Sequence, residues 1–415
     1  MSNPTSPFCM PYRLYNSIQH YSWGSHGADA FIPRLLGIPG EPEKAYAELW
    51  IGTHPNAPSQ VIQDNEHISL ATLIARDPDG ILGTGVAERF NHQLPFLLKV
   101  LSAAEPLSIQ AHPDRAQAQR LHARDPKHYP DANHKPEIAL ALDCLTALAG
   151  LKSAEDLHST LLAYPEIAGL IGKVSADPQE IFAALIRRSL AAPQPFSSAA
   201  RQLAERLKQT PTPRTEVEDL FLALRPVYGD ADVGLLALFL LNLVHLEAGE
   251  GLYVPAGVPH AYLRGNIVEC MANSDNVIRV GLTPKFKDAE ALLEVLASDA
   301  GSLPVLHPEP ELPEMRYPTP AEEFELGRLD LEIGAQLEIP ARHSAQVYLL
   351  TEGRIRVSWN EGVEAYSRGE SFLIPACLPV WQLTALEKTT LFKASVPGGF
   401  IQNPGRQSQA PLQGV

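Results

Sequence analysis

One short stretch of this sequence occurs twice at a constant offset, and it constrains the fold more than any other feature. The copies are Ala248 to His260 and Arg368 to Val380, which read AGEGLYVPAGVPH and RGESFLIPACLPV. In each copy a glycine turn precedes an apolar strand and a proline turn, a pattern typical of all-β proteins. Chance similarity is the alternative, although we favour duplication. Two jelly-roll barrels, whose interior can hold a metal and a small ligand, are therefore expected.

The periodicity of the apolar residues changes along the chain. Short alternating strands reach to about residue 150 and return from about residue 241, whereas the segment between them has the three-and-four spacing of helices. We expect a mainly β fold with an all-α insert. Its expected parts are a first, metal-binding barrel from residues 1–150 and 241–302, a helical insert domain 151–240, a Pro-rich linker 303–320, and a C-terminal barrel 321–415. The expected helices are Ala154 to Leu162, Pro178 to Leu190, Ser197 to Lys208 and Glu216 to Leu224.

The charge and the apolar runs argue against several classes of partner. A formal net charge of -15 disfavours a nucleic-acid surface or an anionic membrane, because both would repel the protein. The longest apolar stretch, Val233 to Leu246, contains Asn242 and His245 and falls short of the ~20 residues of a membrane span. An anionic small substrate remains compatible with a locally basic site. We expect neither nucleic acid nor membrane as a partner, and a monomer.

The cysteines and the N-terminal residues bear on the compartment. The N-terminal stretch lacks the basic segment, apolar segment and cleavage site of a secretion signal. The cysteines have no paired spacing, which argues against a disulfide framework or a thiolate metal site. We expect a cytoplasmic protein. The cysteines are Cys9, Cys144, Cys270 and Cys377.

Four polar side chains indicate one divalent-metal site. The run Leu107 to His112 alternates like a half-buried strand, so Gln110 and His112 project side by side. Glu137 lies in a second alternating run, and His260 follows a turn rich in Pro and Gly. Such ligands suit zinc, with iron or manganese as alternatives, and leave an open position for water or substrate. The alternative is that these are unrelated polar residues at strand ends. In the second copy of the repeat Val380 replaces His260, so a ligand is missing there.

Several longer motifs carry a family resemblance. Together they closely resemble type I mannose-6-phosphate isomerase, in the family's order, over about residues 12–150 and 245–290. The motifs are Tyr21 to Gly24, Glu48 to Pro55, Gln110 to Arg115, Tyr129 to Glu137, Pro259 to Tyr262, Glu269 to Arg279 and Gly281 to Lys285.

The resemblance implies a zinc-dependent cupin enzyme. Its members interconvert mannose 6-phosphate and fructose 6-phosphate through an enediol and so feed mannose metabolism and GDP-mannose supply. The family's ligands for one zinc ion fall on Gln110, His112, Glu137 and His260, and its active-site arginine corresponds to Arg279. The implied partner is a phosphorylated hexose. The C-terminal barrel is then a cupin-like domain without metal ligands.

Three ionisable residues are candidates for catalysis. Glu269 is the only ionisable side chain in its strand and could carry the proton between sugar carbons, with an ion pair to Arg279 or Lys285 as the alternative. Arg279 lies on an apolar strand, where a phosphate or enediolate partner would compensate its charge, and a pair with Asp275 or Glu269 is the alternative. Lys135 shares a strand face with Glu137, so we expect it to hold a substrate hydroxyl or assist proton transfer.

Five residues are candidates for substrate binding. Ser108, Lys99 and Lys285 could supply a hydroxyl and two ammonium groups to the phosphate, although Lys99 is alternatively a strand-end lysine that extends to solvent. Trp23 and Tyr262 are expected to form walls of the pocket, and a plain core position is the alternative for both.

Two other functions compete with the isomerase prediction. A cupin dioxygenase would use iron, but its ligands are generally two closely spaced histidines and a nearby Glu, unlike the spacing of Gln110 and Glu137. A sugar-binding or storage cupin would keep a structural metal, and such a site needs no ionisable set like Glu269, Arg279 and Lys135 beside it.

Overall fold

A large antiparallel sheet carries the candidate metal centre. The computed structural model describes residues 8–398 except residues 64, 174–175, 298, 312 and 341–342. Among these residues the largest sheet has 11 strands. Its strands are β2 Ser17–Gln19, β5 Glu48–Gly52, β8 Phe96–Ala103, β9 Ile109–Ala111, β10 Glu137–Ala141, β11 Leu145–Leu151, β12 Leu241–Leu246, β13 Gly251–Val254, β14 His260–Ala272, β15 Ile278–Gly281 and β16 Val305–Leu306. The main path is β16-β13-β10-β14-β8-β5-β2, and β14 also pairs with β9 and β11, which lead to β15 and β12.

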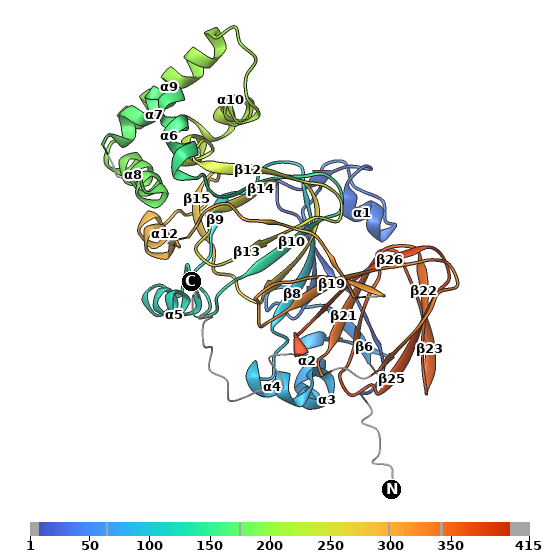
Figure 1. Ribbon diagram of the computed structural model, residues 1–415. Coiled ribbons are helices and arrows are strands. Elements are labelled where there is room, and N and C mark those ends of the chain that lie inside the picture. The colour runs from blue at the N-terminus through green and yellow to red at the C-terminus, as the bar shows by residue number, and fades with distance from the viewer. Residues whose placement is uncertain are drawn as a thin grey trace, which may run out of the picture.

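A second group of strands, coloured orange to red in Figure 1 except for the N-terminal β1, lies at the end of the molecule opposite helices α6 to α10 (residues 154–228). A 7-stranded sheet contains β1 Tyr12–Leu14, β17 Glu309–Glu311, β18 Glu314–Tyr317, β19 Glu325–Leu331, β21 Gln346–Glu352, β24 Ser371–Ile374 and β26 Thr389–Ser395. A 4-stranded sheet contains β20 Gln336–Pro340, β22 Arg354–Trp359, β23 Gly362–Ser367 and β25 Val380–Ala385. Tyr348, Phe372 and Trp381 belong to a core that both sheets share. Two small ribbons pair β3 Ser25–His26 with β4 Ala45–Tyr46 and β6 Gln60–Gln63 with β7 Glu66–Ser69.

The two copies of the repeated sequence have the same local structure. In the first copy β13 ends at Val254 and β14 begins at His260, whereas in the second β24 ends at Ile374 and β25 begins at Val380. A mainly β fold with helices is thus confirmed. Since no sheet is closed among the described residues, the barrels stay a prediction.

The expected helices are present. The helices are α1 Phe31–Leu36, α2 Leu70–Arg76, α3 Pro78–Leu82, α4 Thr84–Arg89, α5 Arg115–Arg124, α6 Ala154–Ala163, α7 Pro165–Ile171, α8 Pro178–Ala191, α9 Pro193–Gln209, α10 Glu216–Tyr228, α11 Val233–Ala237 and α12 Ala289–Val295. Side chains of Ser153, Asp177 and Thr215 cap α6, α8 and α10, which satisfies amide groups that a helix start leaves unpaired. Figure 1 shows α6 to α10 grouped at the end opposite the red strands. In the described parts of the chain, no helix combines the length and apolar character of a membrane span.

The Pro-rich segment and the N-terminus both contribute strands. The segment 303–320 contains β16, β17 and β18, and β16 pairs with β13 while β18 pairs with β19. Strand β1 joins the C-terminal 7-stranded sheet through β24. The expected domain boundaries remain predictions.

The expectation of no disulfide is wrong for one pair. Cys9 and Cys377 are disulfide-bonded, with a Cα–Cα distance of 5.4 Å across a sequence separation of 368 residues. Pairing of β1 with β24 brings these distant segments together, and spacing along the sequence contains no information about that approach. Cys144 and Cys270 are free.

The register of four neighbouring strands builds one wall of the site. Lys99 on β8 is paired with Trp50 on β5 and with Glu269 on β14. Glu137, at the start of β10, is paired with Met271 on β14. Because residues two apart on a strand share a face, Lys99, Glu269 and Glu137 project from the same side of the sheet.

Candidate metal centre

Three buried side chains converge on one point. Ligand atoms of His112, Glu137 and His260 all lie within 4.8 Å of one another, and each residue is fully buried. His260 begins β14, where it pairs with Gln110 on β9, and Glu137 begins β10 on the opposite side of β14. Strand pairing therefore assembles three segments that are far apart in the sequence.

The orientation of the two imidazoles suits a metal ion. His112 Nδ1 donates to the Asn276 carbonyl at 2.9 Å, and His260 Nδ1 donates to the Val258 carbonyl at 3.0 Å. A carbonyl only accepts, so the neutral form of each imidazole carries its proton on Nδ1, and its Nε2 lone pair faces Glu137. His112 Nε2 and Glu137 Oε2 are buried and find no hydrogen-bond partner among the described residues. A divalent cation at this point would satisfy both atoms, so the residues fit such an ion.

Burial and neighbouring charges set the protonation states of His112 and Glu137. Burial lowers the pKa of His112 to about 4, and the nearby Lys135 ammonium adds to this effect. Burial alone would raise the pKa of Glu137, but Lys135, His112 and His260 lower it well below its usual value. The imidazole is therefore neutral and the carboxyl ionised at neutral pH.

Three residues connect the cluster to a cavity. The Tyr262 hydroxyl donates to Glu137 Oε1 at 3.0 Å, and Lys135 Nζ lies 3.2 Å from Glu137 Oε2. The Gln110 side-chain nitrogen lies 3.5 Å from His260 Nε2, and a half-turn of the amide would present its oxygen there instead. Tyr262, Lys135 and Gln110 all line the cavity, which has a volume of about 280 Å³.

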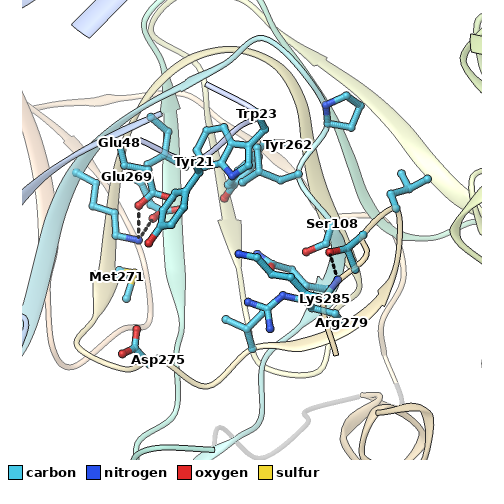
Figure 2. A pocket seen from close by; sticks show the side chains of 18 of the residues that line it. Tyr21, Trp23, Glu48, Ser108, Tyr262, Glu269, Met271, Asp275, Arg279 and Lys285 are labelled. Atoms are coloured by element: carbon cyan, nitrogen blue, oxygen red, sulfur yellow. Dashed lines mark hydrogen bonds and ion pairs between the residues drawn. The ribbon is translucent and has the colours of Figure 1, made fainter. Parts of the chain in front are cut away.

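The cavity gathers every other candidate site residue from the sequence (Figure 2). The sequence-predicted residues that line it are Trp23, Lys99, Ser108, Gln110, Lys135, Tyr262, Glu269, Arg279 and Lys285. Most of its wall comes from β5, β8, β9, β14 and β15 and from the turns that follow them, and the rest comes from the turn after β2, the segment before β10 and the end of α10. The structure thus brings the candidate residues together around one space beside the cluster.

One end of the cavity holds a cation between two carboxylates. Lys99 Nζ lies 3.1 Å from Glu269 Oε2 and 3.5 Å from Glu48 Oε2, and the Trp50 indole nitrogen donates to Glu48. Burial would lower the pKa of Lys99, but the two carboxylates raise it above its usual value. Burial raises the pKa of Glu269, although Lys99 opposes this shift. The expected solvent-exposed alternative for Lys99 does not apply, because this residue is 7 % exposed.

The other end of the cavity is cationic. Ser108, Arg279 and Lys285 lie together there, away from Glu48 and Glu269 (Figure 2). Burial lowers the pKa of Arg279, and burial together with Arg279 lowers that of Lys285. In the described part of the chain neither cation forms an ion pair with a carboxylate, in contrast to the alternatives considered for Arg279 from the sequence. This end therefore favours an anion.

The structure also adds residues that the sequence did not single out. Glu48 precedes Trp50 by two positions on β5, so alternation puts both on one face, but only the register of β5 with β8 brings Glu48 beside Lys99. His54 is buried with Nε2 at 2.9 Å from Asp275, and both line the cavity. Tyr228, the last residue of α10, lines the cavity from the helical segment, and no local pattern indicates this.

Comparison with known proteins gives consistent matches. The model of the phosphomannose isomerase type I catalytic domain matches residues 12–154. Mannose-6-phosphate isomerase 2 of Arabidopsis thaliana is 35% identical, over 94% of this chain and 94% of that protein. The human mannose-6-phosphate isomerase is 35% identical, over 84% of this chain and 88% of that protein.

Solved structures agree with these sequence matches. A mutant of phosphomannose isomerase from Salmonella typhimurium has a TM-score of 0.82 at 32% identity, covering 93% of this chain and 99% of that chain. A zinc-bound mannose 6-phosphate isomerase has a TM-score of 0.82 at 31% identity, with the same coverage.

Replacing His260 with Ala is expected to weaken divalent-metal binding by more than about 100-fold. Loss of a group that only hydrogen-bonds to a metal ligand already costs about 10- to 100-fold in affinity, and loss of the ligand itself costs more. Metal content per chain after dialysis, measured by plasma emission spectrometry, tests this expectation. His245→Ala is the control, since that imidazole is 56% exposed and lies outside the cluster. A dialysed His260→Ala protein with the native metal content would remove His260 from the ligand set.

Proposed function

Because the chain belongs to the type I phosphomannose isomerase family, we propose that it interconverts mannose 6-phosphate and fructose 6-phosphate with one bound zinc ion. The observation that carries this proposal is the buried, hydrogen-bond-deficient cluster of His112, Glu137 and His260 beside a cavity with a carboxylate end and a cationic end. In this proposal Gln110 completes the ligand set. Membership of this family favours the isomerase over the two alternatives considered from the sequence, an iron-dependent cupin dioxygenase and a sugar-binding or storage cupin.

The reaction moves a proton between adjacent sugar carbons through an enediol. Zinc, when bound, would act as a Lewis acid for the negative charge that develops on the sugar oxygens. The chain must supply a base, hold the sugar chain next to the cluster and keep the phosphate at a fixed distance from it. Lys135 and Tyr262 contact Glu137 and line the cavity, so they can orient both the ligand and a substrate hydroxyl.

Glu269 is the proposed proton carrier. It is 3% exposed and projects from the same sheet face as Glu137. Burial raises its pKa, which brings a carboxyl closer to the range where it can both accept and return a proton. The ammonium of Lys99 opposes that shift and keeps the carboxylate available, and Glu48 holds Lys99 from the other side.

The phosphate is proposed to bind at the cationic end. Arg279 and Lys285 offer two cations without carboxylate partners among the described residues, and Ser108 offers a hydroxyl. The sequence also suggested Lys99 as a phosphate ligand. Since Lys99 is held between Glu48 and Glu269, we propose that it serves proton transfer instead.

We further propose the finer features that the sequence suggested. These are two cupin-type barrels from residues 1–150 with 241–302 and from 321–415, the helical insert domain 151–240, and a role in GDP-mannose supply. The equivalent positions of β13 and β24 support the duplication. A monomeric state and a cytoplasmic location remain predictions from the sequence.

A coupled assay tests the proposed activity. The purified, zinc-loaded protein is expected to convert mannose 6-phosphate to fructose 6-phosphate. Formation of fructose 6-phosphate is followed with coupling enzymes that consume it. Unphosphorylated mannose is the matched substrate control, with its product fructose measured directly by chromatography, and it is expected to react far more slowly because the cationic end stays empty. A zinc-loaded native protein that leaves mannose 6-phosphate unchanged would disprove the function.

Replacing Arg279 with Ala is expected to lower turnover by about 10²-fold or more while zinc stays bound, because the substrate phosphate loses a fixed cation and the sugar is no longer held in place beside the cluster. Arg264→Ala is the control, since Arg264 is an exposed arginine on β14. Steady-state rates and zinc content are measured for both variants. Native turnover in the Arg279→Ala protein would assign that arginine to structure.

Two substitutions around Glu269 are expected to move the acid limb of the pH profile in opposite directions. Lys99 lowers the pKa of Glu269, so Lys99→Met raises that pKa and shifts the loss of activity to higher pH by about one unit or more. Glu48 raises the pKa of Glu269, so Glu48→Gln shifts the loss to lower pH. The measurement is kcat/KM against pH. Shifts of the same sign, or none, would argue against Glu269 as the base.

A further inference from the structure

One residue beside the cationic end has an unusual backbone conformation. Leu282 has φ of 56°, in the left-handed region. The other non-glycine residues with positive φ in the described chain are Asn65, Asn91 and His92, which are types that tolerate this region. Leucine has no side-chain group that compensates the strain, so the surrounding structure must impose the conformation. Such strain is concentrated at functional sites.

A buried carboxylate holds this turn. Asp232 Oδ1 accepts the backbone N–H groups of both Gly234 and Leu282, each at 2.8 Å, and its Oδ2 lies 3.0 Å from Lys287 Nζ. Asp232 is 5% exposed and stands at the start of α11. The same oxygen therefore caps α11, which lies between α10 and β12 in the chain, and also fixes the turn that follows β15.

The two backbones touch where the carboxylate joins them. A Cβ atom on Gly281 would lie 2.3 Å from the nitrogen of Gly234, and a Cβ atom on Gly234 would lie 2.6 Å from the nitrogen of Leu282. No side chain fits in either position, because real Cβ atoms do not approach backbone this closely. The close contact leaves the turn little freedom to shift relative to α11.

The turn that Asp232 holds leads directly to the cationic end of the cavity. Leu282, Thr283, Pro284 and Lys285 line the cavity in succession, and Arg279 lies two residues before Gly281 on β15. Lys287 donates to Asp232, whereas Lys285 has no carboxylate partner among the described residues. Lys285 lies beside Ser108 and Arg279 (Figure 2). The position of Lys285 therefore depends on the turn that Asp232 holds.

We propose that Asp232 is a positioning residue for the substrate phosphate, acting through the strained Leu282 turn to place Lys285 beside Arg279. This inference rests on the proposed isomerase function. It assigns to the segment preceding β12 a part in recognising the phosphorylated end of the sugar, although that segment supplies no metal ligand. Asp232 lies outside the cavity lining, so its action is through the turn.

Asp232→Ser separates the two roles of this carboxylate. Serine caps a helix as well as aspartate does, but its shorter side chain withdraws from Leu282 and provides no partner for Lys287. The expected result is a KM for mannose 6-phosphate raised by about tenfold, with kcat changed by less than about threefold and zinc content unchanged. The inhibition constant of inorganic phosphate rises in parallel. Asp232→Asn keeps an oxygen acceptor for both amides and is expected to restore the native KM within about threefold.

One control variant and one measurement on the native protein make the test specific. Ser153→Ala removes the cap of α6 in the same helical region, far from the turn in sequence, and should leave KM unchanged. In the native protein, saturating inorganic phosphate should slow amide hydrogen exchange both in residues 281–287 and in residues 232–237, because the two segments share one carboxylate. This measurement needs no variant, so it decides the matter even if Asp232→Ser does not fold.

The outcomes distinguish this inference from the function on which it rests. A native protein that fails to isomerise mannose 6-phosphate would overturn both. A native protein that is active, together with a folded, zinc-loaded Asp232→Ser protein of native KM and native phosphate inhibition, would overturn the positioning role alone. Exchange slowed by phosphate only in residues 281–287 would also overturn it.

Discussion

The burial of the Glu137 carboxylate is the constraint on which the rest of the site depends. An isolated ion in a protein interior costs several kcal/mol even after relaxation, so this carboxylate requires nearby positive charge and hydrogen bonds. Lys135 and the Tyr262 hydroxyl supply a charge and a hydrogen bond within 3.2 Å of its oxygens. The Nε2 atoms of His112 and His260 lie within 3.3 Å of the same oxygens, with lone pairs that also call for a cation. A cation bound at the same point would complete the compensation, and this requirement explains why a basic residue and two imidazoles surround one acid.

The sheet extends this charge arrangement into the cavity. Lys99 and Glu269 are paired across β8 and β14, while Arg279 and Lys285 follow from β15 and its turn. The cavity is thereby polarised, with a cation between two carboxylates at one end and two cations without carboxylate partners among the described residues at the other. A sugar with a phosphate on one end and a reactive carbonyl on the other matches that polarity.

The candidate site was largely predictable from sequence because its residues lie in short, patterned motifs. Alternation placed Gln110 beside His112 and Lys135 beside Glu137, and the family resemblance connected these pairs to His260. Lys99 could not be assigned in this way. Its partners Glu48 and Glu269 belong to different strands, and their contacts depend on register, which the sequence of any single strand does not contain.

The sequence by itself determined the local elements: the alternating strands, the capped helices, the repeated β unit and the identities of the metal-ligand candidates. The strands and helices follow from periodicity, capping and turn chemistry within a few residues, the repeat from comparing two segments of the chain, and the ligand set from short motifs and the family resemblance. Tertiary structure alone decided which distant segments meet, as in the Cys9–Cys377 disulfide, the Lys99 ion pairs and the Asp232 contact with Leu282. These contacts depend on strand pairing and on close backbone packing between elements, and both are properties of the assembled fold.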